Sequence, residues 1–339
     1  MCPEDRVLTM RMRRDAILLS FFLTAALAAQ QATTWTDPSP HRQRLVRVEP
    51  DVSVEVLDWG GSGRVVVLLA QLTQTAHIYD DWAPKLARTY RVLGITRRGF
   101  GQSSSPSNGY SMERLATDIV SVLDAEKLED PILVGNGFAG EEMSWLGSHA
   151  PDRIAALIYL DAAYDRSNVG AEAAIARRIP SRPVQSQAMT SAQALTQWMS
   201  AGIGFPIPES EVRQLAQFGP DGRVVGQRTP PQIQQQIISR LVKIDYGSIR
   251  VPVLAIYAKR TSADAFPGCR GVDDVAVRQA CGELYDWTSR QLTESEALFK
   301  KIQSPVQVVE LPDAHQFVFL SNERAVMQAM DQFVSALGR

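Results

Sequence analysis

The fold is decided by the stretch Ile132-Leu133-Val134-Gly135-Asn136-Gly137-Phe138-Ala139-Gly140-Glu141-Glu142. It begins as a short apolar run typical of a buried strand, passes through a glycine-rich turn and continues with helical composition. Glycine accepts the positive φ that a sharp turn from strand to helix requires. The stretch therefore predicts a buried strand, a tight turn at Gly137 and a helix that starts directly after it.

On both sides of this stretch, apolar runs of strand length alternate with segments of helical periodicity. We expect strands at 52–57, 64–69, 90–95, 132–134, 154–160, 253–257 and 306–311, and helices at 79–86, 138–149 and 323–337, with a further helix capped by Ser111. The first two strands, joined by a glycine turn, are expected to form a hairpin. This alternation predicts an α/β fold with a mostly parallel central sheet flanked by helices.

The segment 166–245 interrupts the alternation. It contains helical pieces at 191–199, 209–217 and 231–242, separated by joints rich in Pro and Gly. Ligands bind at the strand ends of such sheets, so we expect this insertion to form a helical lid over them. Residues 29–339 are then one domain that carries the lid.

The composition favours a small-molecule partner. The 339 residues are 45% hydrophobic and 21% charged, with a formal net charge of -2. That balance suits a large globular core and leaves no basic excess for nucleic acid or an anionic membrane. We expect no nucleic-acid partner.

The N-terminus has the pattern of a signal peptide. Arg11, Arg13 and Arg14 precede the apolar run 16–29, and Ala26-Leu27-Ala28 offers a cleavage site. An uncleaved anchor is the alternative, but the run is shorter than the roughly 20 residues of a membrane span. We expect residues 1–28 to be removed, leaving an exported protein, periplasmic or secreted, with no stable membrane anchor.

Cysteine usage agrees with export. Cys2 lies ahead of the expected cleavage site, so Cys269 and Cys281 form the only pair in the mature chain. In an oxidising compartment we expect a disulfide between them. In the chain-entropy model, closing this loop would add roughly 3 kcal/mol to the free energy of unfolding.

Four stretches together resemble the α/β-hydrolase superfamily, in its esterase- and lipase-like branch. They are the segment 68–77, which resembles the loop after the family's third strand, the "R-G-x-G-x-S" turn within 96–104, the glycine turn 135–139, and 313–317 beyond the last strand. In that superfamily the glycine turn is the nucleophile elbow, G-x-S-x-G, with the serine lifted above the sheet. This chain has Gly137 at the nucleophile position, so the serine is absent.

The resemblance also implies roles for other residues. His315 takes the place of the catalytic histidine, and either Asp264 or Asp161 would be its acid. The backbone N–H groups of Phe138 and Leu72 would form the oxyanion hole.

Two side chains at the expected pocket depart from the family pattern. Gln71 stands where the family commonly has a small residue, and Asn136 replaces a frequent histidine. The resemblance implies no cofactor and no metal, and a ligand that is an ester or an apolar carbonyl compound.

Three hypotheses remain open from the sequence. In the first, the chain is a non-catalytic, ligand-binding pseudo-hydrolase. In the second, it is an ester hydrolase in which Gly137 is an introduced or recent substitution of Ser. In the third, it is a serine-free enzyme in which His315 and an aspartate act through water. Whether the chain is an enzyme at all therefore stays undecided at this stage.

Overall fold

The computed structural model describes residues 35–167 and 169–338. The chain divides into two units, Met1–Pro38 and Ser39–Arg339, and the fold below is that of the second. The expected signal peptide 1–28 and Cys2 lie outside the described residues.

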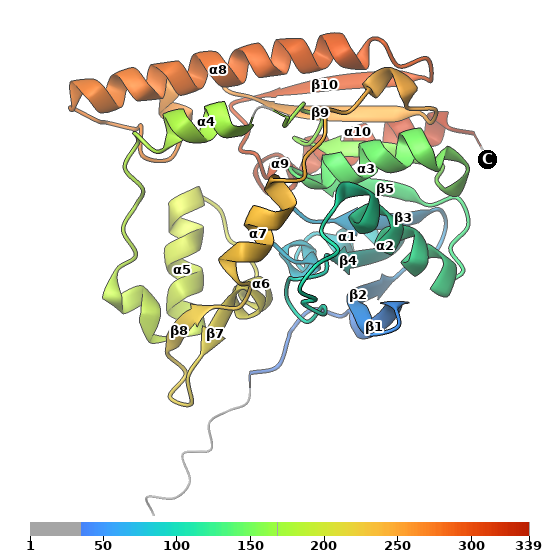
Figure 1. Ribbon diagram of the computed structural model, residues 1–339, viewed down its shortest axis with the longest axis horizontal. Coiled ribbons are helices and arrows are strands. Elements are labelled where there is room, and N and C mark those ends of the chain that lie inside the picture. Colours follow the sequence, from blue (N-terminus) through green and yellow to red (C-terminus); the bar gives the residue numbers. More distant parts are fainter. Residues whose placement is uncertain (1–34, 168, 339) are drawn as a thin grey trace, which may run out of the picture. The chain divides into compact units, whose positions relative to one another are not determined.

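An eight-stranded sheet runs through the second unit (Figure 1). Its spatial order is β1-β2-β4-β3-β5-β6-β9-β10, and every neighbouring pair from β4 to β10 is parallel. The strands are β1 (Arg42–Glu49), β2 (Val52–Gly60), β3 (Val65–Leu69), β4 (Arg91–Thr96), β5 (Ile132–Asn136), β6 (Ala156–Leu160), β9 (Val253–Lys259) and β10 (Val306–Pro312). The predicted mostly parallel sheet is confirmed.

The predicted hairpin of 52–57 with 64–69 is wrong. β2 pairs antiparallel with β1 and β4, whereas β3 lies between β4 and β5 and is parallel to both. The continuous apolar run of β3 is buried on both faces, and such a strand is stabilised by parallel neighbours on each side. The sequence neighbour that pairs with β2 is β1, an edge strand. Its exposed arginines interrupt the apolar pattern, so the sequence did not predict it as a strand.

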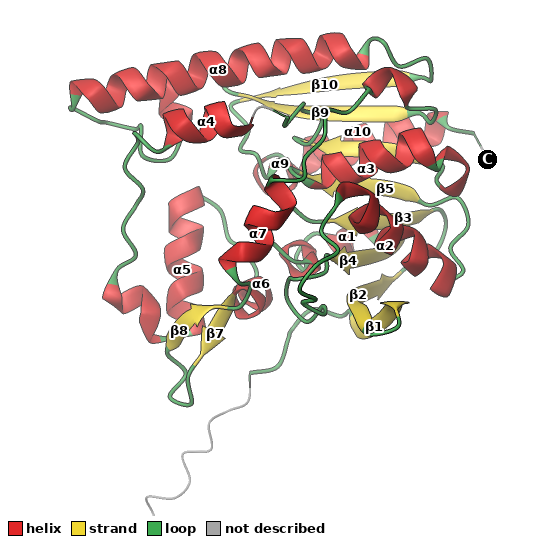
Figure 2. Cartoon of the chain, in the orientation of Figure 1, coloured by secondary structure: helices red, strands yellow, loops and turns green. Residues whose placement is uncertain are grey.

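Helices cover both faces of the sheet (Figure 2). One buried apolar cluster joins one face to α1 (Ala83–Leu86), α9 (Val318–Ser321) and α10 (Glu323–Ala336). A second cluster joins the other face to α2 (Met112–Ala125), α3 (Ala139–His149) and the end of α8 (Val275–Phe299). This is the layered architecture that strand–helix alternation predicts.

The segment between β6 and β9 is mostly helical. It contains α4 (Val169–Ala176), α5 (Ala192–Ile203), α6 (Glu209–Leu215), the small antiparallel pair β7 (Ala216–Phe218) and β8 (Val224–Gln227), and α7 (Pro231–Ile238). The sequence pattern did not predict the strand pair, nor the long helix α8, which buries only a few of its 25 residues. Among the described helices, none has the combined length and apolarity needed to cross a bilayer.

The disulfide between Cys269 and Cys281 is present. Both cysteines are buried in a small apolar cluster with Phe266 and Leu284. The bond therefore ties the loop after β9 to the first half of α8, a helix with little other buried surface.

We expect the double variant Cys269→Ser/Cys281→Ser to lose about 3 kcal/mol of unfolding free energy, because the cross-link restricts the unfolded chain. Urea denaturation followed by circular dichroism measures the loss. Dithiothreitol should bring the wild type to the stability of the variant and leave the variant unchanged. Equal midpoints for the oxidised wild type and the variant would contradict the expectation.

Candidate active site

The turn between β5 and α3 has the geometry of an elbow. Gly137 has φ +55°, a left-handed conformation, and Phe138 and Ala139 lead directly into α3. Close packing of the helix on the strand favours a second glycine, because a Cβ at Gly135 would come within 2.9 Å of the Cβ of Ala139 on α3. The turn is thus built as the sequence predicts, with no side chain at position 137.

Gln71 fills the space above the turn. Its Oε1 accepts the N–H of Leu72 at 2.8 Å and lies 3.4 Å from the N–H of Phe138, which also points to it. These are the two N–H groups that the sequence assigned to an oxyanion hole. A carbonyl oxygen of the protein itself therefore sits where a substrate's carbonyl oxygen would be held.

A buried ion pair holds these parts together. The guanidinium of Arg97, at the end of β4, donates to both carboxylate oxygens of Glu142 on α3, at 2.5 and 2.8 Å. The same guanidinium donates to the carbonyl of Ala70 at 3.0 Å and lies 5.5 Å from the ring centre of Phe138. It thus fixes the residue before Gln71 and the residue after Gly137 relative to each other.

His315 follows β10, in the loop where the sequence placed it. Its Nδ1 accepts the N–H of Phe317 at 3.1 Å, and its ring lies against those of Phe205 and Phe317. Burial and the positive charge of Arg260 lower the pKa of His315 to about 4. The imidazole is therefore neutral at pH 7, with its Nδ1 lone pair turned to a backbone donor.

Asp161 lies at the end of β6 with φ +49°. Its Oδ1 accepts the hydroxyl of Tyr164 at 2.7 Å and the N–H of Ala258 at 3.0 Å. Burial raises the pKa of Asp161, and the charge of Arg260 opposes that shift. The side chain thus joins the ends of β6 and β9.

Asp264 is exposed in a short 3-10 turn, Ala263–Ala265, beyond β9. No hydrogen bond or ion pair between described residues links His315 to Asp264 or to Asp161. The structure brings the histidine loop and the elbow together through a different residue. Asn136 donates from Nδ2 to the carbonyl of Leu160 at 2.6 Å and to that of Gln316 at 2.8 Å.

A cavity of about 310 Å³ opens beside the elbow. Gln71, Asn136, Gly137 and Phe138 line one side of it. The other walls come from residues of α4, α7 and α8 and from the loops after β6, β9 and β10. The insertion 166–245 thus contributes walls to the cavity through α4 and α7. The cavity has the size of a small-molecule site.

Sequence reasoning missed two contributors to this cavity. Arg260 follows β9, close to where the family resemblance placed an acid, and carries the opposite charge. Trp287 lies on α8, a helix that the sequence pattern did not predict. The only signal for Arg260 was its position directly after a buried strand.

A family model described as alpha/beta hydrolase fold matches residues 64–260. The chain is 26% identical over 285 residues to a pyrethroid hydrolase of Sphingobium wenxiniae, covering 80% of this chain and 88% of the relative. It is 32% identical over 99 residues to a putative non-heme chloroperoxidase of Synechocystis sp., and 28% identical over 138 residues to bifunctional epoxide hydrolase 2 of Sus scrofa. The match to the chloroperoxidase covers only 28% of this chain and 35% of that relative. The match to the epoxide hydrolase covers 40% of this chain and 25% of that relative.

Two solved structures illustrate the shared fold. The E-2-(acetamidomethylene)succinate hydrolase structure has a TM-score of 0.65 at 17% identity and covers 87% of this chain and 99% of its own. The bromoperoxidase from Bacillus anthracis has a TM-score of 0.54 at 18% identity and covers 87% of this chain and 100% of its own. At such identities the likeness concerns the fold alone.

We expect the imidazole of His315 to titrate near pH 4, and Arg260→Gln to raise that pKa by removing a nearby positive charge. The proton signals of the ring, followed by NMR between about pH 3 and 8, measure both values. His149, exposed at the end of α3, is the internal reference. An unchanged His315 pKa in Arg260→Gln would contradict the assigned cause.

The same shift has a consequence for stability. The unfolded imidazole takes up its proton near pH 6.5 and the folded one near pH 4. Protons therefore bind preferentially to the unfolded state as the pH falls through this window, and His315 contributes a loss of stability there.

Proposed function

The chain belongs to the α/β-hydrolase fold family, and from this membership we propose that it binds a small ester or other carbonyl compound without acyl-enzyme chemistry. On this proposal it is an exported, ligand-binding pseudo-hydrolase. The disulfide between Cys269 and Cys281 supports export, because such bonds persist mainly in oxidising compartments.

One observation carries the proposal. The amide oxygen of Gln71 occupies the two N–H groups of Leu72 and Phe138. A ligand whose carbonyl oxygen displaces Gln71 would receive the same two donors and leave no buried N–H unpaired. A carbonyl compound is therefore the ligand class that this side of the cavity fits.

The two side chains that acyl transfer would need beside the elbow, a nucleophile and a paired histidine, differ from the family pattern. Gly137 offers no hydroxyl, so the acyl-enzyme route is closed. His315 presents Nδ1 to the N–H of Phe317, and within residues 35–167 and 169–338 no carboxylate bonds to its ring to stabilise the protonated form. The nearby charge of Arg260 also disfavours an imidazolium. These features weigh against the serine-free His/Asp enzyme.

An ester hydrolase that has lost its serine is the second candidate. The three atoms nearest to a Cβ at Gly137 would all belong to the side chain of Gln71, the nearest being Oε1 at 3.0 Å. The backbone there already has the strained left-handed conformation of an elbow nucleophile. A serine could therefore be carried if Gln71 turned away.

Gly137→Ser should create slow hydrolysis of p-nitrophenyl acetate, and Gly137→Ser/Gln71→Gly should be faster by about a hundredfold in kcat/KM. Removing one oxyanion-hole donor typically lowers kcat by roughly 10² to 10³. Gln71 occupies both donors here, so removing its side chain should free them. A serine-directed phosphonate should label both variants at position 137 and should not label the wild type.

Gly137→Ser/Gln71→Gly/His315→Ala is the control for the base and should lose most of the rate of the double variant, keeping only what the open oxyanion hole contributes. Stoichiometric labelling of the wild type would mean that another serine is the nucleophile. Equal rates for the single and double variants would show that Gln71 does not block the hole.

Binding tests the proposal without turnover. Gln71→Gly should bind the stable amide 4-nitroacetanilide about tenfold more tightly than the wild type, because no side chain has to be displaced. Gln71→Glu should bind it more weakly, since a carboxylate accepts the two N–H groups more strongly than an amide does. Calorimetric titration of the three proteins measures the order, and equal affinities would overturn the displacement model.

A further inference from the structure

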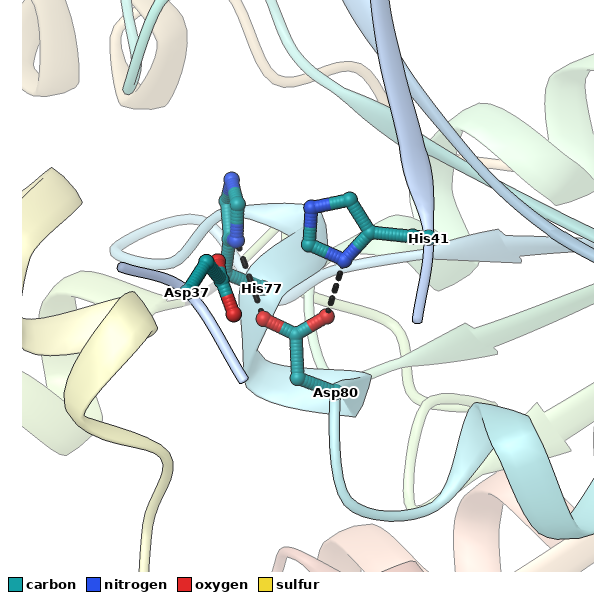
Figure 3. Close-up of side chains that lie close together, drawn as sticks. All are labelled: Asp37, His41, His77 and Asp80. Atoms are coloured by element: carbon teal, nitrogen blue, oxygen red, sulfur yellow. Dashed lines mark hydrogen bonds and ion pairs between the residues drawn. The ribbon is translucent and has the colours of Figure 1, made fainter. Parts of the chain in front are cut away.

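A cluster of titratable side chains lies apart from the cavity, at the other end of the loop that carries Gln71. Its centre is Asp80, which caps the 3-10 turn Ala76–Tyr79. The Nδ1 of His41 lies 2.9 Å from Asp80 Oδ1, and the Nδ1 of His77 lies 2.9 Å from Asp80 Oδ2. Figure 3 shows the two rings facing the carboxylate from different sides.

The cluster is buried and acidic. The side chains of His41, His77 and Asp80 are 4%, 1% and 3% exposed. Glu55, fully buried, lies beyond His77 with its Oε1 at 3.4 Å from Nε2. In the part of the chain that the structure describes, the ion pairs of Asp80 and Glu55 are with histidines and none is with Arg or Lys. Buried carboxylates of this kind are paired with cations or bind metals.

The outer contacts have the arrangement of a metal site. A metal-bound histidine commonly presents its second nitrogen to a carboxylate, which fixes the ring and its tautomer. With its proton on Nε2, His77 would donate to Glu55 and turn the Nδ1 lone pair towards Asp80. The hydroxyl of Ser210, on α6, donates to Asp80 Oδ2 at 2.5 Å and holds the carboxylate in place.

We propose that His41, His77 and Asp80 bind one divalent cation, with zinc the best match. Their donor atoms lie within 4.8 Å of one another, so small movements can place all three around one ion. Two imidazole nitrogens and one carboxylate oxygen are ligands that zinc accepts at about 2.0–2.2 Å. The ion would supply positive charge between Asp80 and Glu55 and join the start of β1 to the 3-10 turn.

Zinc titration tests the site. Chelator-treated protein should take up one equivalent of Zn²⁺ with micromolar or tighter affinity, measured in competition with a chromophoric indicator. His41→Ala and Asp80→Asn should weaken binding by at least about tenfold, and Glu55→Gln by about 10- to 100-fold through the second nitrogen of His77. His149→Ala, at an exposed histidine, is the matched control and should bind as the wild type does.

Two readouts on the wild type keep the proposal testable if a variant fails to fold. Zn²⁺ should raise Tm by about 2 °C or more and EDTA should reverse the rise, because an ion that binds only the folded state stabilises it. Co²⁺ should give the visible absorption of a tetrahedral site. Zinc uptake by the wild type no greater than by His41→Ala, or no Tm change, would show that N–H···O bonds alone hold the cluster.

Discussion

The arrangement of the site depends on the ion pair between Arg97 and Glu142. Both side chains are buried, and its two short hydrogen bonds oppose part of the cost of burying the two charges. The guanidinium also holds the carbonyl of Ala70, so one side chain connects β4, the loop after β3 and the first turns of α3. The N–H groups of Leu72 and Phe138 face the same point because the residues around them are fixed by this contact.

Within that frame, Gln71 and Gly137 form a complementary pair. A side chain at 137 would contact Gln71, and without one the amide can lie over the turn and occupy both N–H groups. The pairing stabilises donors that would otherwise be buried and unsatisfied. The missing side chain at position 137 and the placement of the Gln71 amide against both N–H groups therefore belong to one arrangement of the turn.

The sequence predicted most of the fold and part of the site. Buried strands and the turn at Gly137 were predictable because apolar runs and glycine reflect local constraints. The pairing of β2 and β3 was predicted wrongly, because strand order depends on contacts between distant segments. The sequence also did not show that, among the described residues, the Nδ1 of His315 meets the N–H of Phe317 and no carboxylate, because side-chain direction in a loop depends on the contacts of the folded chain. The helix α8 buries too few residues to give a clear apolar pattern.

The loop from Ala70 to Asp80 connects the two sites described above. At one end the guanidinium of Arg97 holds the carbonyl of Ala70, and at the other the carboxylate of Asp80 lies 2.9 Å from the Nδ1 of His41 and of His77. Between them, Thr75 donates its N–H to Glu211 on α6 at 3.1 Å, and burial raises the pKa of that glutamate to about 8. The hydrogen bond from Thr75 to buried Glu211 and that from Ser210 to Asp80 thus attach the loop to α6.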